Sequence, residues 1–174
     1  MRFDDDDFLK DTGDETAETG SDELLSDEDL RLPDEASPLV RLHAVRAWLT
    51  RQRKETTIEI GTAALSLQEA QQDQNVSHLR RREMQRIEAQ RQQALQDLQA
   101  AQQRLTAFEE AEELLTECIV HTTSNERTLV EYYLALEELT LHEQEESQAP
   151  SSPRYEALID VLQRVEHVGS PNEE

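Results

Sequence analysis

Two glutamate–histidine pairs have a spacing that puts both side chains on one face of a helix. They are Glu117 with His121 and Glu138 with His142, and Cys118 lies three residues before His121. These side chains can ligate metals, but helical two-metal sites use Glu-x-x-His from two helices, a spacing absent here. A cysteine nucleophile is disfavoured because neighbouring glutamates would raise the pKa of Cys118. We expect no metal, no cofactor and no enzymatic activity.

Five arginines form the strongest basic cluster, and we call them the basic patch. They are Arg80, Arg81, Arg82, Arg86 and Arg91. The patch could contact RNA, a phosphoinositide or an acidic partner, or it could be the polar face of a helix that pairs with glutamates of the second half. We favour the helix face, because no aromatic residues are interleaved for base stacking. The net charge of −22 also argues against nucleic acid as the primary partner.

The first 35 residues hold fifteen acidic against three basic side chains, a net charge of −12. Self-repulsion and scarce apolar area predict a disordered acidic tail over residues 1–36. Its apolar residues form a candidate linear motif that folds on a partner: Phe3, Phe8, Leu9, Leu24 and Leu25. The alternative is a tail that serves solubility only.

Composition predicts an all-α protein. Hydrophobic residues make up 36% of the chain and aromatic residues 4%, and leucine and alanine alternate with glutamate, glutamine and arginine, which favour helices. The single cysteine, Cys118, excludes an intramolecular disulfide and suits a reducing compartment. The chain has neither a signal-peptide pattern nor the roughly 18 consecutive apolar residues of a membrane helix. We expect a soluble, cytoplasmic protein.

Start and stop signals divide the rest of the chain into segments. Ser37-Pro38 begins an amphipathic helix over 37–72, with a weak point or kink near Gly61 after a β-branched run. A junction follows over 73–83, then a coiled-coil helical hairpin over 84–148 whose second helix has Thr123 as its N-cap. A linker over 149–152 leads to a C-terminal amphipathic helix over 153–169, which should dock on the hairpin. The expected fold is an elongated helical hairpin with this short docked helix.

The first helix of the hairpin carries an apolar seam that repeats alternately every three and four residues. This seam extends over five heptads, which is typical of a coiled coil. Its apolar members are Met84, Ile87, Ala94, Leu98, Ala101, Leu105, Phe108, Leu115 and Ile119. In the second helix, Leu129, Tyr132, Leu136 and Leu139 form the seam, with Tyr133, Leu134 and Leu141 alongside.

Charge predicts how the halves pair. Residues 41–91 carry a net charge of +4 and residues 105–146 one of −11, so an antiparallel arrangement would bring opposite charges together. We expect a non-enzymatic coiled-coil scaffold or adaptor that self-associates, as a homodimer through residues 84–120, and bridges or positions partner proteins. The seam would serve equally in an intramolecular bundle. The alternative function is an acidic regulatory module that captures and inhibits or chaperones a basic protein.

Overall fold

The computed structural model describes residues 36–74, 80–146 and 152–169 of the chain. Nearly all of these residues lie in four helices, and the described ranges contain no strand, so the predicted all-α fold is confirmed. The helices are α1 (Pro38–Gln74), α2 (Arg81–His121), α3 (Asn125–Glu146) and α4 (Pro153–Gly169). The predicted acidic tail lies outside the described residues, apart from Ala36. None of the described helices has the length and apolar character that crossing a membrane requires.

Helix α1 begins at the predicted Ser-Pro signal and continues through Gly61 without interruption. The backbone N–H of Val40 donates to Oγ of Ser37 at 3.4 Å, so the serine caps the helix. In the β-branched run, the hydroxyl of Thr56 donates to the carbonyl of Gln52 at 2.8 Å, four residues back. The hydroxyl of Thr56 thus makes its hydrogen bond within the helix, which extends to Gln74.

Side chains also set the starts of the other helices. Glu83 caps α2 by accepting a hydrogen bond from the backbone N–H of Arg80 at 2.9 Å. Helix α3 is capped by Ser124, which accepts from the N–H of Arg127 at 3.3 Å, and not by the predicted Thr123. Ser152 caps α4 by accepting from the N–H of Tyr155 at 3.0 Å, as its Ser-Pro sequence predicts.

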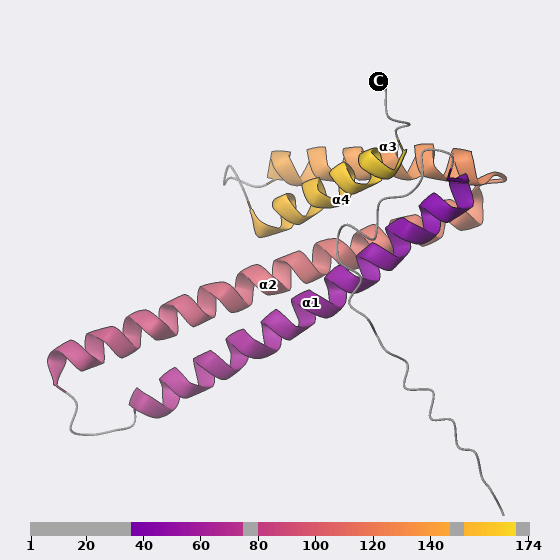
Figure 1. Cartoon of the computed structure of the whole chain (residues 1–174). Helices are drawn as coiled ribbons and strands as arrows, with labels where there is room; N and C mark the ends of the chain where they lie inside the picture. The colour runs from indigo at the N-terminus through magenta and orange to yellow at the C-terminus, as the bar shows by residue number, and fades with distance from the viewer. Residues whose placement is uncertain (1–35, 75–79, 147–151, 170–174) are drawn as a thin grey trace, which may run out of the picture. The chain divides into compact units, whose positions relative to one another are not determined.

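Helices α1 and α2 run side by side in opposite directions, and α3 and α4 lie along one end of this pair (Figure 1). We call the α1–α2 part that extends beyond α3 and α4 the two-helix end, and the rest the four-helix end. Helix α2 makes its most extensive contacts with α1. The sequence instead predicted that α2 pairs with α3 in a hairpin. The lengths explain the pairing with α1, because α1 has 37 residues and α2 has 41, whereas α3 has 22.

The two ends bury side chains of different size. The core of the two-helix end consists mostly of alanine: Ala63, Ala70, Ile87, Ala94 and Ala101. The core of the four-helix end is larger and includes Leu42, Val45, Trp48, Leu49, Phe108, Leu115, Tyr132, Leu136, Leu158, Val161 and Val165. There the rings of Trp48 and Phe108 meet edge to face, with centroids 6.0 Å apart. Most of the apolar stabilisation therefore lies at the four-helix end.

Candidate protein-interaction surface

The structure shows the surroundings of two side chains that could do chemistry, Cys118 and His142. Cys118 is half-buried, and burial raises the pKa of its thiol, with smaller contributions from Glu131 and Glu117. Nε2 of His142 lies 3.3 Å from a carboxylate oxygen of Glu146, and its predicted companion Glu138 is not part of that contact. Within the described ranges no three metal-ligating side chains come together.

The basic patch lies at the start of α2, at the two-helix end, and all five arginines are exposed. Arg91 lies 3.8 Å from Glu88 on the same helix. Among the described residues, no ion pair is found for Arg81, Arg82 or Arg86. The patch therefore does not neutralise the acidic second half. The candidate linear motif lies outside the described residues: Phe3, Phe8, Leu9, Leu24 and Leu25.

Two other arginines contact the acidic segment: Arg53, which lies in the predicted basic segment, and Arg154, whose contacts the sequence did not predict. Arg53 of α1 forms ion pairs with Glu112 and Glu109 of α2, the latter at 3.4 Å. Arg154 of α4 lies 2.6 Å from Glu110 of α2 and 3.4 Å from Glu143 of α3. Two helices that cover the acidic part of α2 thus each bring an arginine to it.

The predicted seam of α2 is used inside the chain. Five of its residues are buried: Ile87, Ala94, Ala101, Phe108 and Leu115. Leu98 and Leu105 are half-buried, and Met84 and Ile119 are exposed. These five residues form a stripe that repeats every seven positions and packs within the fold. A dimer through this seam would have to replace those contacts.

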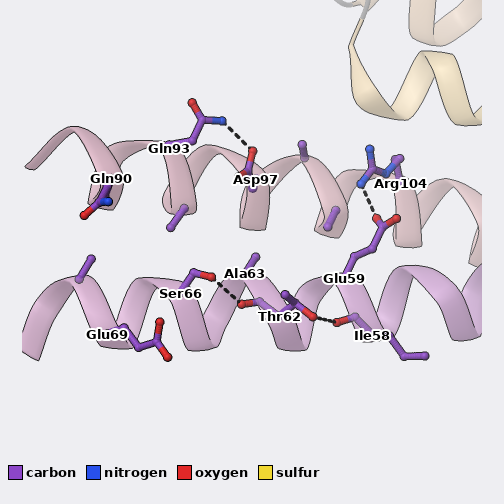
Figure 2. A pocket seen from close by; sticks show the side chains of 14 residues that line it. Ile58, Glu59, Thr62, Ala63, Ser66, Glu69, Gln90, Gln93, Asp97 and Arg104 are labelled. Carbon is purple, nitrogen blue, oxygen red and sulfur yellow. Dashed lines mark hydrogen bonds and ion pairs between the residues drawn. The ribbon is translucent and has the colours of Figure 1, made fainter. Parts of the chain in front are cut away.

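A groove of about 770 Å³ lies between α1 and α2 at the two-helix end. Figure 2 shows its polar side chains, several of which bind one another. Arg104 pairs with Glu59, and the amide of Gln93 donates to Asp97 at 2.8 Å. The space arises because the facing core residues, such as Ala63, are small. Its polar groups are largely occupied, so it presents no converging set of free functional groups.

Helix α3 exposes an apolar stripe on the side that faces away from the core. Val130, Leu134 and Leu141 are exposed, and their spacing of four and seven places them on one helical face. The opposite face is buried through Tyr132 and Leu136. The sequence located these two residues on the seam and Leu134 and Leu141 beside it. The sequence did not predict that these flanking leucines stay exposed. The signal that could have shown it is the presence of apolar residues outside the seam.

Two grooves flank this stripe, and Leu134 lines both. One, at the start of α1, has a volume of about 640 Å³ and is also lined by Pro38, Tyr133 and Val165. The other, which we call the α3 groove, has a volume of about 740 Å³. Its apolar floor consists of Leu114, Leu134, Leu139 and Leu141, and its carboxylates are those of Glu137, Glu138 and Glu145. The stripe and both grooves together are the α3 surface.

The carboxylates of the α3 groove are not neutralised by the fold. Glu137, Glu138 and Glu145 form no ion pair with any residue in the described ranges. Among the described residues that line the groove, none is lysine or arginine, and His142 is the single nitrogen base. This groove thus combines exposed leucines with uncompensated negative charge.

Protein-family models, curated proteins and solved structures were compared with the chain, and none of them matches it. A function must therefore be inferred from the surfaces that the residues of the chain form.

Proposed function

We propose that this chain is a non-enzymatic helical scaffold or adaptor that bridges partner proteins, and that it binds one of them through the α3 surface. The observation that carries the proposal is the exposed stripe of Val130, Leu134 and Leu141, since contiguous exposed apolar area on a protein is typical of interaction sites. A helix that serves packing alone needs apolar residues only on the face it buries.

The state of the reactive side chains supports a role in binding over one in catalysis. A nucleophilic cysteine needs a lowered pKa, whereas that of Cys118 is raised by burial. The polar groups of the α1–α2 groove are largely paired with each other, as in the contact of Arg104 with Glu59. These features favour a protein whose activity is to hold other proteins.

Bridging requires a second binding site, and we assign it to the acidic tail with its candidate linear motif. The tail's net charge of −12 and its spaced apolar residues are typical of segments that fold on a partner. The α3 surface and the tail would then bind different proteins. Self-association as a homodimer stays a prediction, and through the α2 seam it would compete with the packing of α1.

The alternative function, capture of a basic protein by an acidic regulatory module, also has a specific observation in its favour. It is the set of carboxylates in the α3 groove, Glu137, Glu138 and Glu145, which lack a counter-charge in the described structure. An adaptor needs two partners that bind independently, whereas a capture module needs only one.

The test is affinity capture from the native host with four versions of the full chain: wild type, Leu134→Glu, a deletion of residues 1–35, and Leu65→Glu. The control is matched, since Leu134 is 55% exposed on α3 and Leu65 is 62% exposed on α1. We expect Leu134→Glu to lose one set of partners, the deletion to lose another, and Leu65→Glu to retain both.

Two results would contradict the adaptor. If one set of partners depends on both the tail and Leu134, the chain captures a single target and the alternative function holds. If Leu134→Glu and Leu65→Glu retain the same proteins as wild type, the α3 surface is not a binding site. Circular dichroism of each variant verifies that the helices are intact.

A further inference from the structure

We infer that the α3 groove binds a basic amphipathic helix from another protein. This inference rests on the proposed use of the α3 surface and names the chemistry of the partner. Apolar side chains of such a helix would enter the groove, and its lysines or arginines would reach the glutamates.

We infer a helical guest from the residues that line the groove. Leu134 and Leu141 stand seven residues apart along α3, so the leucines of the floor follow two turns of a helix. Leu114 of α2 lines the groove together with the α3 residues, so a guest would contact both helices. A helix that lies in such a groove presents apolar residues at positions i, i+3 or i+4, and i+7.

The sign of the charge determines which amphipathic helix fits. Glu137, Glu138 and Glu145 line the groove, and no described lysine or arginine pairs with them. Burying apolar area beside them brings these carboxylates into a less polar environment, where an opposite charge becomes more favourable and a like charge more costly. A basic helix is therefore favoured and an acidic one excluded.

The fold itself shows the same solution at two other places. The acidic part of α2 is covered by α1, whose Arg53 pairs with Glu112, and by α4, whose Arg154 pairs with Glu110. In both cases an amphipathic helix buries apolar residues and brings an arginine to the glutamates. The α3 groove has the leucines and the glutamates of those contacts, and within the described residues no such helix covers it.

Two other occupants fit less well. A second copy docked α3 to α3 would set Glu137, Glu138 and Glu145 against the same residues of its partner, which like-charge repulsion opposes. The chain's own first 35 residues carry a net charge of −12, so they would meet the same repulsion. A basic helix from another protein avoids both penalties.

The test uses the full chain and three designed peptides of about 20 residues, two of which have leucine at helical spacing. One peptide carries lysine at its other positions and the second carries glutamate at the same positions. A third, with the composition of the first in scrambled order, controls for non-specific attraction. Binding is measured by fluorescence anisotropy at low and at physiological salt.

We expect the lysine peptide to bind at least about tenfold more tightly than the other two. The variant Leu134→Gln removes the leucine that the bound peptide would cover, so it should weaken binding by about tenfold or more. The matched control Leu65→Gln should leave binding unchanged. The double variant Glu138→Gln/Glu145→Gln should weaken binding at low salt and flatten the salt dependence, because it removes two of the charges that are screened.

Equal binding of the ordered and scrambled lysine peptides would overturn the inference, because attraction would then be purely electrostatic. Equal binding of the lysine and glutamate peptides would refute the charge requirement. If sedimentation shows that wild type self-associates and that Leu134→Gln abolishes this, the groove belongs to a second copy. The capture experiment is independent of the peptide experiment. If host partners are lost in Leu134→Glu but the lysine peptide does not bind, the adaptor function is retained and only the basic helix is refuted.

Discussion

Tyr132 shows how the core of the four-helix end accommodates a polar atom. Its side chain is fully buried, and its hydroxyl donates a hydrogen bond to the backbone carbonyl of Ala111 at 2.9 Å, which ties α3 to α2. Burial raises the pKa of this phenol, and Cys118 and Glu112 add smaller contributions in the same direction. The neutral phenol is thus the form that the fold requires.

Replacing Tyr132 by phenylalanine tests this at neutral pH, at pH 9 and at pH 11. At neutral pH, Tyr132→Phe should lower the free energy of unfolding by about 1 kcal/mol, because the buried hydrogen bond is lost. A group whose pKa is raised by folding stabilises the fold below its unfolded pKa, about 10 for tyrosine, and this contribution is lost as the pH rises further. Urea unfolding should therefore show wild type losing more stability than Tyr132→Phe between pH 9 and pH 11.

The matched control is Tyr133→Phe, which removes the same hydroxyl from the neighbouring, half-buried residue. Its stability should follow that of wild type at all three pH values. A Tyr132→Phe protein that is as stable as wild type at neutral pH would show that the bond to Ala111 contributes nothing net.

At the scale of the element, α1 shows a helix that tolerates residues of low helix propensity. Gly61 is exposed, and a Cβ placed there would meet no atom within 4 Å. Because glycine costs about 0.8–1 kcal/mol relative to alanine inside a helix, Gly61→Ala should stabilise the protein by up to about that amount. Urea unfolding measures this; an unchanged or lower stability would mean that α1 is not an uninterrupted helix at this position.

Local patterns predicted the helices because their signals act over a few residues. Ser37-Pro38 and Ser152-Pro153 marked two starts correctly, since a capping hydroxyl and a fixed proline angle act on the adjacent turn alone. The choice between Thr123 and Ser124 failed, because either hydroxyl could reach a free N–H of the first turn of α3. The prediction that α2 pairs mainly with α3 was also wrong. An apolar seam indicates that another helix will cover it, but it does not specify which helix.

The candidate surface was only partly predictable for the same reason. The sequence showed that Leu134 and Leu141 lie beside the α3 seam, but their exposure depends on where α2 and α4 pack. Likewise, glutamates such as Glu112 and Glu138 are alike in the sequence. Arg53 neutralises the first and no described cation neutralises the second, and only the packing of the helices determines this difference.

At the scale of the whole molecule, stability should be distributed unevenly between its two ends. The two-helix end buries alanines and one larger residue, Ile87, whereas the four-helix end buries Trp48, Phe108, Leu115 and Tyr132 among others. Since the free energy of burial scales with apolar area, a helix pair held by methyl groups opens at a lower cost than a four-helix core. The salt bridge of Arg104 with Glu59 adds little, because both side chains are more than a third exposed and water screens the charges.

Hydrogen exchange measured along α2 tests this gradient, because one continuous helix passes through both ends. Amides near Ile87 and Ala94 should exchange roughly tenfold or more faster than those near Ala111 and Leu115, reporting local opening of the two-helix end. The variant Ala94→Leu, which adds apolar area next to the groove between α1 and α2, should slow exchange there and leave the four-helix end unchanged. Uniform protection along α2 would instead mean that the two ends unfold as one cooperative unit.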